Sequence, residues 1–147
     1  MKILMAVLAA GFVWAVGCSD ALARKAVTPE VVIATFEKAG IPIGDKEVYT
    51  AETDVNKLLG RPGQYVAKAN WADSRLRQPA DDMAGGSVEI FRNERDLKAR
   101  KAYVENIGRA MPTMAQYQYQ KGLVLIRLDK ALTPEGAAEY EKAIKAL

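Results

Sequence analysis

Carboxylates and guanidinium groups are concentrated in one stretch of the chain that also contains glycine and proline. Its charged members are Asp73, Arg75, Arg77, Asp81 and Asp82. Two carboxylates in different surroundings can act as a general acid and a general base, and several carboxylate oxygens can bind a cation. Because the spacing does not match the Asp/Asn pattern of a calcium-binding loop, we predict a long solvated loop over residues 73–86 and no metal site.

The chain contains no histidine and only one cysteine. The lack of histidine excludes catalytic triads with a histidine base and histidine-ligated zinc or haem sites. A single thiol cannot supply a cysteine metal site either. We therefore predict a protein that is not an enzyme and that has no catalytic residues and no cofactor. The alternative that the residues leave open is an envelope enzyme that uses carboxylates alone.

Two further residues have side chains suited to binding a partner. Arg61 lies in Arg61-Pro62-Gly63 and can present its planar guanidinium to an anion or a protein. Trp71 is next to the charged loop, and aromatic residues with arginine are favoured at binding hot spots. The predicted partner surface consists of Arg61, Trp71, Asp73, Arg75 and Arg77. The structural alternatives are a tight turn for Arg61 and packing within a sheet for Trp71.

An uncharged apolar segment, residues 3–17, follows Lys2 and ends at Cys18. It has the length of a signal-peptide core and is shorter than the roughly 20 residues that span a bilayer. The small residues Ala15-Val16-Gly17 precede Cys18, so we expect cleavage before Cys18 and lipidation of its thiol. The alternative is cleavage after Ala21-Leu22-Ala23, which would release a soluble periplasmic protein.

The rest of the chain is long enough for one domain. We expect residues 1–17 to be a signal peptide, 18–27 a tether and 28–147 a single domain. The formal net charge is +3, with basic and acidic residues interspersed. This distribution gives no reason to expect a nucleic-acid partner.

Helix and strand signals alternate along the predicted domain. Thr-Pro-Glu at 28–30 and at 133–135 begin two helices, and Asn93 begins a third that ends near Gly108. Asp54 is expected to cap a single helical turn over residues 55–59. Strands are expected at 64–72 and 87–92 and in a hairpin of 116–120 with 123–128, and residues 46–50 are a strand or an extended loop. We predict an α+β fold with an antiparallel or mixed sheet of about four strands and three main helices on one face.

Several segments together resemble small bacterial lipoproteins described only as putative or hypothetical. The resemblance lies in the end of the apolar segment at Cys18 and in residues 49–54, 59–65, 86–91 and 132–135. It implies a lipid anchor on the outer side of the cytoplasmic membrane. Apart from the resemblance, we expect the domain to bind a protein or envelope partner at the membrane surface. Because Ser19 rather than Asp follows Cys18, transfer to the outer membrane would be permitted in a diderm. The resemblance implies no activity and no site residues.

Overall fold

The structure is a computed structural model and describes residues 26–76 and 84–147. The described residues form three α-helices, a short 3-10 helix and five strands. In chain order they are α1 (Pro29–Lys38), β1 (Ile43–Val48), β2 (Ala67–Asp73), β3 (Gly85–Ile90), α2 (Glu94–Ala110), η1 (Pro112–Met114), β4 (Gln116–Lys121), β5 (Val124–Asp129) and α3 (Pro134–Ile144).

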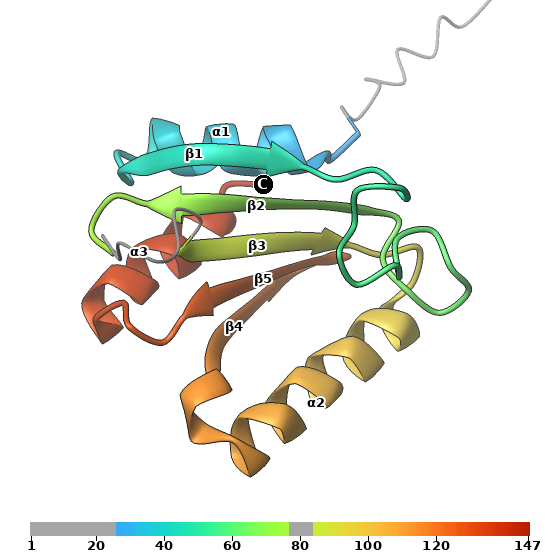
Figure 1. The fold of residues 1–147 in the computed structure, drawn as a ribbon. Helices are drawn as coiled ribbons and strands as arrows, with labels where there is room; N and C mark the ends of the chain where they lie inside the picture. Colours follow the sequence, from blue (N-terminus) through green and yellow to red (C-terminus); the bar gives the residue numbers. More distant parts are fainter. Residues whose placement is uncertain (1–25, 77–83) are drawn as a thin grey trace, which may run out of the picture.

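The strands form one sheet in the order β1-β2-β3-β5-β4, and every neighbouring pair is antiparallel. The connection through α2 carries the chain from β3 to the far edge, and the hairpin then returns β5 to the side of β3 (Figure 1). The α+β class is confirmed. The sheet has five strands rather than about four, because residues 43–48 pair with β2 as an edge strand whose register shifts between Ile43 and Lys46.

The helix starts follow their capping residues. The hydroxyl groups of Thr28 and Thr133 accept hydrogen bonds from backbone N–H groups in the first turns of α1 and α3, and a proline occupies the first position of each helix. Asn93 caps α2 in the same way. The expected end of this helix at Gly108 is wrong: α2 continues to Ala110, and Gly108 packs closely against Ala115.

The helices α1 and α3 cover one face of the sheet with a dry apolar core (Figure 1). Its centre is an aromatic group in which Phe36 lies 5.3 Å from Trp71 and 4.9 Å from Tyr140, measured between ring centroids. Gly86 lets this group pack against β3, because a Cβ atom at Gly86 would overlap the Trp71 ring. These contacts fix both helices to the sheet.

The opposite face is covered only in part. A small apolar cluster of Tyr65, Phe91, Leu97 and Leu125 joins α2 to the sheet. The expectation that all helices lie on one face is therefore wrong, because α2 crosses the face opposite α1 and α3 (Figure 1).

The segment between β1 and β2 folds over this second face without forming a helix. The expected helical turn at 55–59 is wrong, since residues 51–63 form successive turns. The turns are organised around Asp54, which is completely buried and accepts hydrogen bonds from the backbone N–H groups of Leu58 and Leu59. A carboxylate that satisfies several backbone donors replaces the helical hydrogen bonds here.

Candidate binding site on the polar face of the sheet

A continuous row of polar side chains crosses all five strands on the face that carries α2. The strand register pairs each member directly with the next. From β1 to β4 the row consists of Glu47, Asn70, Ser87, Arg127 and Gln118. The neighbours of these residues along each strand, such as Trp71, Val88 and Ile126, point into the apolar core on the other face.

Three atoms of this row are buried without a partner. Among the described residues, the buried side-chain atoms that make no hydrogen bond are Asn70 Oδ1, Arg127 Nε and Gln118 Oε1. A buried polar atom without a partner costs about 1–3 kcal/mol, and buried polar groups are normally satisfied. The three orphaned atoms therefore mark a place where the fold keeps polar groups at a cost to its stability.

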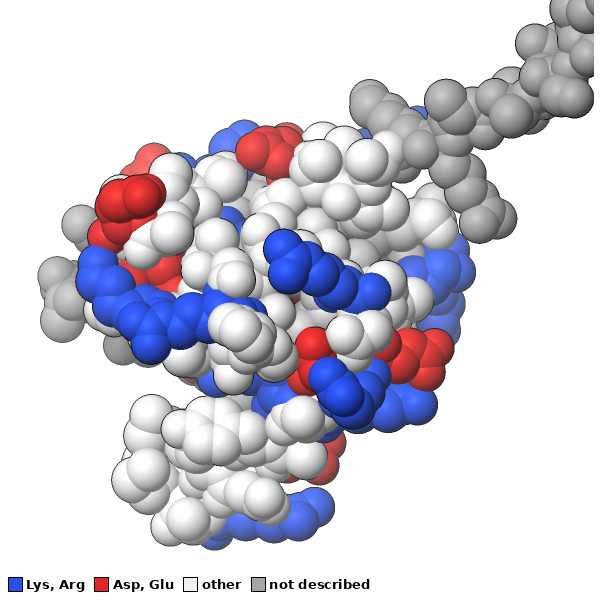
Figure 2. All heavy atoms as spheres, turned by 90° about the vertical axis from the view of Figure 1, so that its right-hand side faces the viewer, with Lys and Arg blue, Asp and Glu red and all other residues white. Residues whose placement is uncertain are grey.

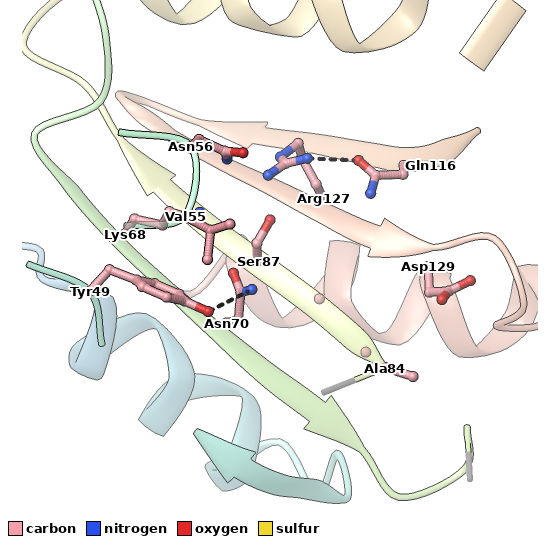
Figure 3. A pocket seen from close by; sticks show the side chains of 12 residues that line it. Tyr49, Val55, Asn56, Lys68, Asn70, Ala84, Ser87, Gln116, Arg127 and Asp129 are labelled. Carbon is pink, nitrogen blue, oxygen red and sulfur yellow. Dashed lines mark hydrogen bonds between the residues drawn. The ribbon is translucent and has the colours of Figure 1, made fainter. Parts of the chain in front are cut away.

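A pocket of about 300 Å³ opens over the middle of the row. Asn70, Ser87 and Arg127 project into it from β2, β3 and β5 (Figure 3). Tyr49 forms one wall, where its hydroxyl accepts a 3.2 Å hydrogen bond from Asn70 Nδ2. On the other side, Arg127 Nη1 donates a 2.9 Å hydrogen bond to Gln116. These two bonds fix the side chains while leaving Asn70 Oδ1 and Arg127 Nε unpaired.

The charged groups next to the pocket are paired with one another. Glu89 is fully buried and receives hydrogen bonds from both Arg127 (2.8 Å) and Arg100 (2.9 Å). Buried charges need such partners because their desolvation is costly. The guanidinium of Arg127 is thus held in place by Glu89 on β3 and by Gln116 on β4.

A second buried ion pair lies next to this one. Lys68 Nζ is 2.8 Å from Asp54 Oδ1 and lies 4.5 Å from the centroid of the Tyr49 ring. Burial alone would raise the pKa of Asp54, but the hydrogen bonds from Lys68, Tyr65 and two backbone N–H groups hold this pKa well below its usual value. Burial and then the nearby Glu47 carboxylate raise the pKa of Tyr49 to about 12, so its hydroxyl stays protonated.

Two further hollows next to the pocket lie between the sheet and α2. One hollow, of about 380 Å³, shares Asn56, Gln116 and Arg127 with the pocket, and another, of about 260 Å³, is lined by Gln116 and Gln118. Figure 2 shows the C-terminal end of α2 and η1 as a mostly uncharged part of the surface at the bottom of the view. Asn70, Ser87, Arg127 and Gln118 of the row line these three adjoining hollows, two of which lie against α2, and we call the hollows together the groove.

The predicted partner surface is wrong for Trp71. Its side chain is completely buried between α1, α3 and β3, and Nε1 donates a 3.1 Å hydrogen bond to the Tyr140 hydroxyl. The alternation of the strand is real, but the face that carries Trp71 is the dry one. Packing within the sheet, the structural alternative, is the correct interpretation.

The prediction is also wrong for Asp73, which ends β2 and is buried rather than part of a solvated loop. Its carboxylate accepts hydrogen bonds from Arg75 and from the Tyr140 hydroxyl. Burial raises its pKa, but these donors, Arg75 first, lower the pKa below its usual value overall. Arg75 is partly exposed and also bonds Glu139 on α3. This network joins β2 to α3.

The remaining predicted residues are not brought together. Arg61 is exposed in a turn in which Gly63 has a φ of +75°, which agrees with the structural alternative of a tight turn. Arg77, Asp81, Asp82 and Cys18 lie outside the described residues.

Within the described ranges, no group of His, Cys, Asp or Glu residues is arranged to hold a metal ion. In residues 26–76 and 84–147, none of the helices has the length and apolarity needed to cross a membrane.

The residues of the row were not predicted from the sequence, although a signal for them exists. Each strand of the middle of the sheet has polar residues at alternate positions, for example Lys68 and Asn70 in β2, or Ser87 and Glu89 in β3. Such alternation normally indicates a solvent-facing side. Only the fold shows that these positions lie under α2 and the turn segment.

Comparisons with known proteins identify no relative of this chain. No protein-family model, no curated protein and no solved structure gives a significant match.

Proposed function

We propose that this protein is a lipid-anchored binding domain of the cell envelope that holds a polar ligand in the groove on the α2 face of its sheet. The single observation that supports this binding site is the position of the three orphaned buried atoms, which all lie in one row across the strands. A ligand that forms hydrogen bonds with these atoms removes the free-energy cost of leaving them unpaired. The site therefore favours binding over a purely structural role.

The proposed anchor rests on the sequence. Cys18 follows an apolar segment and three small residues, a pattern typical of lipidation sites. The first helix begins with its cap at Thr28, so the segment from Cys18 to Thr28 would serve as a tether about ten residues long, with a maximum reach of about 35 Å. This arrangement would keep the groove close to the membrane surface.

The binding site can be tested by nuclear magnetic resonance with the full-length chain labelled with ¹⁵N and kept in detergent micelles. Defined probes would be added one class at a time: neutral sugars, amino-acid amides, acetate and inorganic phosphate. We expect at least one class to shift the backbone amide signals of Asn70, Ser87 and Arg127. If none of the four classes changes these signals at millimolar concentration, the groove is not a binding site for small polar ligands.

The anchor is tested separately by intact mass spectrometry of the chain extracted from membranes of its native host. The expected product begins at Cys18 and carries two or three acyl chains, because one chain holds a protein only weakly to a bilayer. The Cys18→Ala variant should lack this mass and leave the membrane fraction. A native product that begins at Arg24 without a lipid would contradict the anchor and support the secretory alternative.

A further inference from the structure

We infer that the ligand of the groove is a neutral, hydroxyl-rich molecule of the carbohydrate class rather than an anion. This inference rests on the proposed binding function and adds the chemistry of the ligand. It follows from the balance of charge around the row, from the kinds of hydrogen-bonding groups left free, and from the direction in which the row crosses the sheet.

The charge balance does not favour an anion. Arg127 and Arg100 share Glu89, and Lys68 is paired with Asp54. Asp129 adds a further carboxylate to the pocket lining. With Glu47 at the β1 end of the row, the three cations of the site face four carboxylates. An anionic ligand would have to compete with buried carboxylates that already hold the cations at 2.8–2.9 Å.

The free hydrogen-bonding groups include both donors and acceptors. Asn70 Oδ1 and Gln118 Oε1 are acceptors, and Arg127 Nε between them is a donor. The Ser87 hydroxyl, which lines the pocket between Asn70 and Arg127, can be either. A carboxylate ligand only accepts hydrogen bonds and would leave both amide oxygens unpaired. Hydroxyl groups donate and accept, so neighbouring hydroxyls on one ligand can satisfy the whole row.

The row favours an elongated ligand. Neighbouring strands are about 4.8 Å apart, so the three strand spacings from Asn70 on β2 to Gln118 on β4 span about 14 Å. The pocket over Asn70 and Arg127 and the hollow beside Gln118 share Gln116 in their linings. A ligand that pairs with both ends of the row therefore lies across the strands and passes beneath α2, as a short oligosaccharide can.

The remaining polar groups of the lining agree with this class. Asn56, Gln116 and the Tyr49 hydroxyl add uncharged donors and acceptors at the walls of the pocket (Figure 3). The Tyr49 hydroxyl also accepts a hydrogen bond from Asn70 Nδ2, which fixes this wall of the pocket. Recognition by many uncharged hydrogen bonds predicts affinity that depends little on salt.

The test is isothermal titration calorimetry of the full-length chain in detergent. The probes are glucose, N-acetylglucosamine, the β-1,4-linked di- and trisaccharides of each, acetate and inorganic phosphate. We expect a di- or trisaccharide to bind at least tenfold more tightly than acetate or phosphate, with less than about a twofold change between low and high salt. Ser87→Ala and Gln118→Met should each weaken binding at least tenfold.

The matched control is Lys142→Ala, which alters an exposed residue of α3 on the opposite face and should bind as the unmodified chain does. Thermal melting of each variant verifies that it is folded.

Tight binding of acetate or phosphate without sugar binding would overturn the carbohydrate class while leaving the groove a binding site. Sugar binding that survives in both row variants would also overturn the inference, because the ligand would then lie elsewhere. Binding of no probe, together with an unresponsive row in the magnetic resonance experiment, would contradict the proposed function itself.

Discussion

Lys68 donates a 2.8 Å hydrogen bond to Asp54, and neither side chain is more than 5% exposed. The two residues come from different kinds of structure, a strand in the sheet and a turn that folds over it. Asp54 also accepts hydrogen bonds from the Tyr65 hydroxyl and from the backbone of Leu58 and Leu59. The pair therefore fixes the turn segment to the sheet and forms one side of the groove.

The two members of this pair should not contribute equally to stability. Asp54→Ala removes the acceptor of several donors and leaves Lys68 as a buried charge without its counter-ion, so we expect the free energy of unfolding to fall by about 3–5 kcal/mol. Lys68→Met leaves Asp54 with its remaining donors and should cost only about 1–2 kcal/mol. Urea denaturation of both variants measures the difference. Equal losses would mean that the carboxylate does not organise the turn.

Acid should weaken the fold in a defined range. The pKa values of Asp54 and Asp73 lie below the usual value in the folded chain, so each carboxylate binds protons more readily when the chain unfolds. Their contribution is fully present above the ordinary pKa of about 3.9 and is lost as the pH falls below it. Denaturation at pH 7 and at pH 3 should show this loss. Asp54→Asn should reduce the pH dependence, and an unchanged dependence in that variant would count against the prediction.

The Tyr140 hydroxyl connects two buried groups on the other face. It accepts a hydrogen bond from Trp71 Nε1 and donates one to Asp73 Oδ2. Tyr140→Phe leaves both without that partner and should lower the free energy of unfolding by about 1–3 kcal/mol. The same change at the exposed Tyr103 should alter stability by less than about 0.5 kcal/mol. Thermal or chemical unfolding compares the two variants, and equal effects would show that the buried hydroxyl is not needed.

A substitution that removes an orphaned polar atom from the row should make the fold more stable. Gln118→Met has a similar shape and removes the orphaned Oε1 atom, so it should raise the free energy of unfolding by about 1 kcal/mol. The control is Gln120→Met, two residues along the same strand, where the side chain is exposed and stability should change by less than about 0.5 kcal/mol. A destabilised Gln118→Met variant would show that the amide already has partners and is not held free for a ligand.

Much of the fold could be predicted from local signals. The caps at Thr28, Asn93 and Thr133 place all three helices, because capping and apolar spacing depend on nearby residues. The segment before β2 was harder to predict. Strict alternation over the expected strand 64–72 would place Tyr65 on the same face as Trp71, but the strand begins at Ala67 and the two side chains belong to clusters on opposite faces.

The candidate site could not be predicted, because its members are brought together only by long-range pairing. Ser87 and Arg127 are adjacent solely because β5 returns between β3 and β4. Charged residues such as Lys68 and Glu89 suggest solvent when their distant partners are unknown. The cluster of charges in residues 73–86 was the more conspicuous local signal, yet its first member, Asp73, serves to hold β2 to α3.

The strand order also determines which forms of the chain can bind. The central groups of the row come from β2, β3 and β5, and the C-terminal hairpin supplies β5 and β4. A chain truncated before this hairpin retains Asn70 and Ser87 but lacks their neighbours, so it offers no site. A ligand that bridges β2 and β5 would therefore recognise only the complete native sheet. At a concentration one hundred times its Kd it would add about 2.7 kcal/mol to the free energy of unfolding, and a rise in melting temperature would reveal it even before its chemistry is known.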